Sequence, residues 1–126
     1  MNILVVDDNR DAAEMLAALF ESRGHRVAMA HEPLGALAQT RDFHLDAAIL
    51  DLDLPSMDGY ELAEHLRVNG AKCRIVVVTG SPHRDVQRCA KLDIAGYLVK
   101  PVDFDALAAA IEGDRLPTAR RGSAAR

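Results

Sequence analysis

Five short apolar segments alternate along the chain with stretches that have helical character. The first of them, residues 2–6, is rich in β-branched residues, as central strands are. Parallel strands need a long return connection, usually a helix, so a strict alternation of the two element types favours a parallel sheet. The pattern therefore predicts an α/β fold, a doubly wound open sheet of five strands with helices on both faces. The expected strands cover residues 2–6, 26–30, 45–50, 74–78 and 95–99.

Five further segments carry the boundary signals of helices. Asn9 and Asp58 are suitable N-caps. Pro33 and Pro82 suit a first helical turn, and Gly24 supplies a stop. The expected helices cover residues 9–23, 32–40, 60–68, 82–91 and 103–112. Helical spacing predicts that these apolar residues face the sheet: Ala12, Met15, Leu16, Leu19 and Phe20 in the first helix, and Val86, Cys89 and Ala90 in the fourth.

The length and charge of the chain limit what it can do. With 126 residues, 49% of them hydrophobic, it can bury one good core. Residues 115–126 contain four Arg and no acid and lack apolar periodicity, so we expect a domain over 1–114 and a disordered basic tail over 115–126. The first 114 residues contain 11 basic and 19 acidic residues, a formal charge of −8. Such an acidic domain argues against direct nucleic-acid binding.

The cysteines and the first strand indicate a cytoplasmic protein. Cys73 and Cys89 have neither metal-ligand nor redox-pair spacing, so we expect them to pack as ordinary side chains in a reducing compartment. The apolar run Ile3 to Val6 is too short for a signal peptide or a membrane span, and we expect no membrane association. The histidines show no ligand spacing either. We expect all five to be surface residues: His25, His31, His44, His65 and His83.

Polar residues follow the ends of four of the five expected strands. Asp7 and Asp8 follow the first, and Asp51 follows the third. Thr79 follows the fourth, and Lys100 follows the fifth. In an open parallel sheet, ligands bind outside the carboxyl ends of the strands, where the strand order reverses. We therefore expect these five side chains to converge at one edge of the sheet.

The convergence of three carboxylates predicts a cation site. Mg²⁺ fits, because it is usually held by one or two carboxylates together with waters and a phosphate oxygen. Lys100 adds a positive charge and Thr79 a hydroxyl donor for a phosphoryl group. Asp51 stands directly after a buried strand, where an unpaired carboxylate is costly. It is the candidate nucleophile for an aspartyl phosphate.

Four segments around these residues resemble the receiver domains of bacterial two-component response regulators, and the resemblance extends over residues 1 to about 113. It implies the flavodoxin-like strand order 2-1-3-4-5. The matching segments are Val5-Val6-Asp7-Asp8-Asn9, Asp51-Leu52-Asp53-Leu54-Pro55-Ser56-Met57-Asp58-Gly59, Val77-Val78-Thr79-Gly80 and Tyr97-Leu98-Val99-Lys100-Pro101.

The resemblance also implies roles for the site residues. Asp51 would accept a phosphoryl group from the phosphohistidine of a histidine kinase or histidine phosphotransfer protein, assisted by Thr79 and Lys100. The protein would then be a signalling phosphoacceptor and not an enzyme beyond its own phosphotransfer and dephosphorylation. Thr79 and Tyr97 would form a switch that alters partner binding, with phosphorylation-dependent homodimerisation as one outcome. The implied Mg²⁺ ligands are Asp7, Asp8, Asp51 and the backbone carbonyl of Asp53.

Asp93 and Asp53 are acids at two positions that affect the fold and the site. The family usually has Gly before the fifth strand where this chain has Asp93, and the stretch 79–100 is about one residue short. Asp tolerates left-handed backbone better than most residues, so we expect the fourth helix to end there. Asp53 is an acid that the metal site does not need. If its backbone carbonyl binds the metal, its side chain is free to point across the site.

Other interpretations start from the same residues. Asp51 and Asp53 also resemble the first motif of haloacid-dehalogenase-like phosphatases, but there the acidic pair follows the motif Lys, whereas Asp7 and Asp8 come first here. The chain is also too short for the usual cap domain. A flavin-binding module would need backbone N–H donors and hydroxyls for the flavin phosphate, but this sequence is acidic at the strand ends. A non-phosphorylated docking module remains as an alternative, and the chain could stand alone or come from a hybrid kinase.

Overall fold

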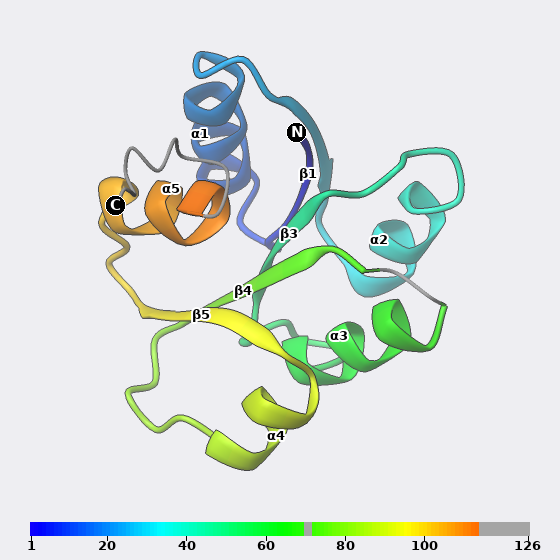
Figure 1. The fold of residues 1–126 in the computed structure, drawn as a ribbon, viewed down its shortest axis with the longest axis vertical. Helices are drawn as coiled ribbons and strands as arrows, with labels where there is room; N and C mark the ends of the chain where they lie inside the picture. The colour runs from blue at the N-terminus through cyan, green and yellow to red at the C-terminus, as the bar shows by residue number, and fades with distance from the viewer. Residues whose placement is uncertain (70–71, 114–126) are drawn as a thin grey trace, which may run out of the picture.

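The computed structural model describes residues 1–69 and 72–113, which form a five-stranded parallel sheet between two layers of helices (Figure 1). The strand order is β2-β1-β3-β4-β5, so the expected fold and order are confirmed. Residues 115–126, the predicted tail, lie outside the described part. The elements are β1 (Asn2–Val6), α1 (Arg10–Glu21), β2 (Arg26–Ala30), α2 (Pro33–Gln39), β3 (Ala47–Asp51), α3 (Gly59–Val68), β4 (Arg74–Thr79), α4 (Val86–Lys91), β5 (Ile94–Val99) and α5 (Phe104–Glu112).

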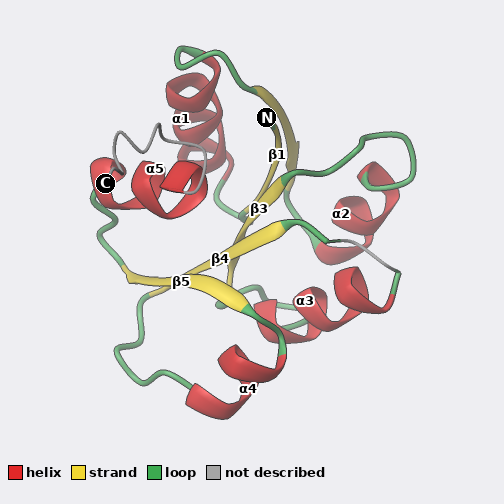
Figure 2. Ribbon diagram, in the orientation of Figure 1, coloured by secondary structure: helices red, strands yellow, loops and turns green. Residues whose placement is uncertain are grey.

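The two helical layers bury different faces of the sheet. Helices α1 and α5 lie on one face, and α2, α3 and α4 lie on the other (Figure 2). The first face is packed around Phe20, Leu107 and Ile111, and the second around Leu50 and Leu62. Because β1, β3 and β4 are covered on both sides, their sequences are almost continuously apolar. In the part of the chain that the structure describes, no helix combines the length and apolar character needed to cross a bilayer.

Helix α1 buries only part of the stripe predicted for it. Asn9 caps it as expected, accepting a hydrogen bond from the backbone N–H of Ala12. Phe20 is buried and Leu16 packs against the core as predicted, but the other buried residues are Ala13 and Ala17. Met15 is 64% exposed, and Leu19 is exposed as well. Small alanines let a helix approach a sheet closely, so the contact line follows Ala13, Ala17 and Phe20 and leaves Met15 and Leu19 outside.

Helix α4 is shorter than predicted. It begins at Val86, four residues after Pro82, because Asp85 is the N-cap and accepts a hydrogen bond of 3.0 Å from the backbone N–H of Arg88. The carboxylate cap outweighs the start signal of the proline. The expected inward stripe is correct only for Cys89, which is half-buried against the core. Val86 is 67% exposed, and Ala90 is exposed. Only a narrow part of α4 therefore contacts the sheet.

The turn after α4 behaves as the sequence predicts. Asp93 takes a left-handed backbone with φ 55° and ends the helical segment. The guanidinium of Arg67 in α3 donates to the backbone carbonyls of Leu92, at 3.0 Å, and Cys73, at 2.7 Å. Arg67 thus ties the turn to the chain that enters β4.

A cluster of charged groups joins the end of α1 to α5 and corrects the surface prediction for His25. The His25 side chain is only 10% exposed. Its Nε2 lies 2.7 Å from Oε2 of Glu112, and its Nδ1 lies 3.1 Å from the amine of Met1. Arg23 forms an ion pair with the same carboxylate, with Nε 2.9 Å from Oε2. Histidine spacing gives no sign of this cluster, because its members are distant in sequence.

We expect the Glu112→Gln variant to be less stable than the parent in a pH-dependent way. The hydrogen bond from Arg23 and, after it, the one from His25 outweigh burial and lower the pKa of Glu112 to about 2. A carboxyl whose pKa is lowered by folding contributes stability above its ordinary pKa of 4.5, and this contribution disappears as the pH falls towards 2. Since Arg23 is partly exposed, the loss at pH 7 is expected to be about 1 kcal/mol.

Urea unfolding between pH 2 and neutral pH measures this difference. The exposed Glu61→Gln change in α3 is the matched control and should have little effect at any pH. A Glu112→Gln deficit that stayed constant down to the lowest pH would show that packing, and not the charge, stabilises this corner.

Candidate functional site

All five polar residues singled out at strand ends lie at the carboxyl edge of the sheet. Strand β1 leads into Asp7 and Asp8, and β3 ends at Asp51. Strand β4 ends at Thr79, and β5 is followed directly by Lys100. The sheet runs from β1 to β2 on one side and from β1 to β3 on the other, so the order reverses at β1 and β3. Asp7 and Asp51 therefore stand at the topological switch point.

The carboxylates of Asp7, Asp8 and Asp51 form a compact acidic cluster, with one oxygen of each lying within 4.8 Å of the others. Asp51 is only 2% exposed and Asp7 is buried, whereas Asp8 is open to solvent. Burial raises the pKa of Asp7 and the charge of Asp51 acts in the same direction, against a backbone hydrogen bond from Asn9. Concentrated oxygen donors of one charge fit a hard cation such as Mg²⁺.

Each carboxylate oxygen of Asp51 has a donor. Lys100 Nζ lies 3.1 Å from Oδ2, and the backbone N–H of Asp53 donates to Oδ1 at 2.8 Å. Burial acts to lower the pKa of Lys100, but the hydrogen bond to Asp51 and the surrounding carboxylates raise it. The hydrogen bond therefore keeps the positive charge of Lys100 directly beside Asp51. Its backbone N–H donates to the carbonyl of Thr79 at 2.7 Å, which fixes β5 against β4 at this edge.

Thr79 and Asp53 are joined across the site. The Thr79 side chain is buried, and its hydroxyl donates to Oδ1 of Asp53 at 3.0 Å. The backbone N–H of Gly80 donates to Oδ2 of Asp53 at 2.9 Å. The sequence offers no signal for Gly80, because its contribution is a backbone donor that any residue except proline could supply.

Tyr97 contacts the loop after β4 and not the acidic cluster. Its hydroxyl donates to the backbone carbonyls of Ser81, at 2.9 Å, and His83, at 3.0 Å. The guanidinium of Arg84 lies 5.1 Å from the ring centroid. Burial, with the nearby Cys89 next in weight, raises the pKa of the Tyr97 hydroxyl. Thr79 and Tyr97 are thus connected through the intervening loop.

Gly59 allows α3 to start directly beneath the loop that carries Asp51. Asp58 caps the helix by accepting a hydrogen bond of 2.8 Å from the backbone N–H of Glu61. A Cβ atom at position 59 would lie 2.7 Å from the carbonyl oxygen of Asp51 and 2.7 Å from Cδ2 of Leu52. Only glycine fits here without displacing the backbone of Asp51.

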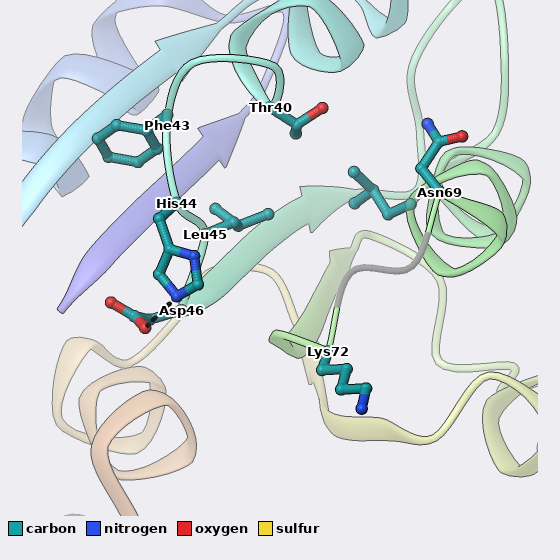
Figure 3. Close-up of a pocket in the computed structure, with 8 residues that line it drawn as sticks. Thr40, Phe43, His44, Leu45, Asp46, Asn69 and Lys72 are labelled. Carbon is teal, nitrogen blue, oxygen red and sulfur yellow. Dashed lines mark ion pairs between the residues drawn. The ribbon is translucent and has the colours of Figure 1, made fainter.

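A cavity of about 390 Å³ lies away from these residues (Figure 3). It opens near the amino ends of β3 and β4, opposite the carboxyl edge. None of the strand-end residues lines it, so this cavity is separate from the candidate site. The lining residues are Thr40, Phe43, His44, Leu45, Asp46, Leu66, Asn69 and Lys72.

Comparison with known families identifies the family of this chain. The model of the response regulator receiver domain matches residues 3–112. The chain belongs to the response regulator receiver domain family. The acidic cluster of Asp7, Asp8 and Asp51 in this receiver domain fits a phosphoacceptor role.

Individual relatives agree with the assignment. The response regulator MprA of Mycobacterium avium is 36% identical over 111 residues, which is 86% of this chain and 48% of MprA. The sensor histidine kinase RcsC of Escherichia coli K12 is 32% identical over 108 residues, 85% of this chain and 11% of RcsC. The chain thus spans about a tenth to a half of the length of these two relatives.

Solved structures include a similar receiver with a bound ion. The response regulator TrrA of Thermotoga maritima, solved in complex with Mg²⁺ and BeF, aligns with a TM-score of 0.78 and 27% identity. The alignment covers 89% of this chain and 96% of TrrA.

Proposed function

We propose that Asp51 of this receiver domain accepts a phosphoryl group from the phosphohistidine of a histidine kinase or a histidine phosphotransfer protein. The observation that carries the proposal is the position of Asp51, buried at the end of β3 beside the carboxylates of Asp7 and Asp8 and 3.1 Å from Lys100 Nζ. The similarity to RcsC, a sensor histidine kinase, supports a phosphohistidine donor.

The transfer is a displacement at phosphorus. A carboxylate oxygen of Asp51 forms the new P–O bond, the P–N bond to the donor histidine breaks, and the imidazole leaves with its electron pair. Lys100 faces the charge on the phosphoryl oxygens, and the Thr79 hydroxyl can donate to one of them. Mg²⁺, when bound, would neutralise part of this charge. The ligands proposed for it are the carboxylates of Asp7, Asp8 and Asp51 and the backbone carbonyl of Asp53.

We further propose that Thr79 and Tyr97 form the switch that alters partner binding. The support is the loop from Gly80 to Arg84, which begins at Thr79 and is held by the Tyr97 hydroxyl at Ser81 and His83. A move of Thr79 towards a phosphoryl oxygen would pull on this loop. We also propose that the domain ends at residue 114 and is followed by a basic tail, and that the protein is cytoplasmic. The partners proposed for the switch are a downstream protein and a second copy of the phosphorylated chain.

The phosphatase alternative finds no support in the geometry. It requires Asp53 to act as a general acid and base on a leaving group or water. Both oxygens of Asp53 instead accept hydrogen bonds, from Thr79 and Gly80. Signal transfer, and not turnover of a substrate, is the function that the site supports best.

Incubation with Mg²⁺ and acetyl phosphate tests the proposal, because a small phosphodonor needs no kinase. Intact-mass spectrometry is expected to show a single phosphoryl adduct that depends on Mg²⁺. The acidic cluster repels an anionic donor unless a cation is present, so a chelator should suppress the adduct. An adduct that formed equally well in chelator, or no adduct at all, would contradict the proposal.

A further inference from the structure

The carboxylate of Asp53 is surrounded by three groups that suit a phosphoryl oxygen. The Thr79 hydroxyl and the Gly80 backbone N–H donate to it at 3.0 and 2.9 Å. The Lys100 ammonium lies 4.0 Å from its Oδ2 and 3.1 Å from Oδ2 of Asp51. A hydroxyl, an amide and an ammonium therefore hold an anion two residues from the phosphoacceptor.

A phosphoryl group on Asp51 would seek the same donors. It carries three strongly accepting oxygens and a charge close to that of two carboxylates. The Thr79 hydroxyl and the Gly80 N–H have one proton each to donate. Each can serve Asp53 or a phosphoryl oxygen fully, but not both at once. Asp53 is 48% exposed, so its side chain can leave these donors and be solvated by water.

We propose that the carboxylate of Asp53 is a built-in competing anion. It occupies the Thr79 hydroxyl and the Gly80 N–H while Asp51 is free, and a phosphoryl group must displace it to reach them. The inference rests on the proposed function of Asp51. Its consequence is that the phosphorylated state is less favourable than it would be with an uncharged, non-accepting residue at position 53.

The displacement also reaches the loop after β4. Gly80 is the first residue of that loop, and Tyr97 holds the loop further along at Ser81 and His83. Exchange of the Asp53 carboxylate for a phosphoryl oxygen changes the anchor at one end while Tyr97 keeps the other. Asp53 therefore sets the resting position of the segment next to α4.

Simple charge repulsion between Asp53 and a phosphoryl group would also disfavour the phosphorylated state. The two explanations differ in what they require of Thr79. Repulsion acts whether or not residue 79 has a hydroxyl, whereas competition needs that hydroxyl as a contested donor. The Thr79→Val change removes the hydroxyl and keeps the shape, so a double-mutant cycle with Asp53→Ala separates them.

The experiment measures, by calorimetry, the binding of Mg²⁺ with beryllium fluoride as a phosphoryl mimic. We expect Asp53→Ala to bind the mimic about tenfold more tightly than the parent, a factor equivalent to about 1.4 kcal/mol. In the Thr79→Val background the same change is expected to gain only about threefold. Asp58→Asn is the matched control, because it removes one charge from the same loop and keeps a helix cap. Mg²⁺ alone is also titrated into each variant, so that the affinity for the mimic is compared between Mg²⁺-bound proteins.

A second measurement does not depend on the mimic. The amide resonance of Gly80 is expected to move upfield in Asp53→Ala, because the N–H loses its charged acceptor, and an unmoved resonance would overturn the inference. The inference would also be overturned if Asp53→Ala raised the affinity for the mimic equally with and without the Thr79 hydroxyl, or if it did not raise the affinity at all while the parent bound the mimic. These outcomes leave the proposed function intact. A parent that neither binds the mimic nor takes a phosphoryl group would overturn both.

Discussion

Replacing Asp51 with Asn is expected to leave the protein folded but without any phosphoryl adduct in the presence of Mg²⁺ and acetyl phosphate. An amide is not a nucleophile under these conditions, and no other carboxylate in the cluster lies against Lys100 as closely: its Nζ is 3.1 Å from Asp51. The loss should therefore be complete within detection, not a partial slowing. The folded state should persist, because removal of one charge reduces the repulsion that raises the pKa of Asp7.

The matched control for this experiment is Asp42→Asn, an exposed acid in the loop before β3. It should acquire the adduct at the rate of the parent. Peptide mapping of the parent adduct after reductive trapping should place it on the peptide with Asp51. An adduct on Asp51→Asn of the same size as on the parent would move the phosphoacceptor to another residue and refute the assignment.

The Gly59→Ala variant is expected to lose about 2 kcal/mol of unfolding free energy, with a thermal midpoint lower by several degrees. At an ordinary helix start the same change would be neutral or stabilising, because alanine is the better helix former. Here the new Cβ would lie 2.7 Å from the Asp51 carbonyl oxygen and 3.0 Å from Cα of Leu52. Backbone atoms cannot rotate away, so the loop itself must shift. The sign of the effect thus distinguishes the close contact from simple propensity.

Gly80→Ala is the control for this change. A Cβ at position 80 would lie 3.7 Å from Oδ2 of Asp53, an ordinary contact, so little change in stability is expected. Because Gly59→Ala displaces the backbone of Asp51, it should also slow phosphorylation by acetyl phosphate. A Gly59→Ala protein as stable as the parent would mean that α3 can slide away from the phosphoacceptor loop without cost.

The sequence predicted the fold and the position of the site for the same reason. Strands buried on both faces need continuous apolar runs, and a polar residue at the end of such a run is conspicuous. Asp51, Thr79 and Lys100 could be placed at one edge because parallel strands all point the same way. Capping residues such as Asn9 also gave correct helix starts, since the cap is a local interaction.

What the sequence could not predict depends on contacts between distant residues or on backbone atoms. The Glu112 carboxylate meets His25 only because α5 packs beside the end of α1, and no spacing rule encodes that meeting. The start of α4 was misplaced because Asp85 and Pro82 both signal a helix start, and local propensity does not decide between them. The exposed Met15 follows from how closely the alanines of α1 approach the sheet.

The loop between β4 and α4 has a consequence for how this protein can diverge from its relatives. Tyr97 holds it through the carbonyl oxygens of Ser81 and His83, and Asp53 holds it through the N–H of Gly80. Nearly every amino acid supplies these backbone atoms. Substitutions at exposed positions such as His83 can therefore accumulate without releasing the loop. Such substitutions can change which partner this surface binds without changing the residues of the phosphorylation site.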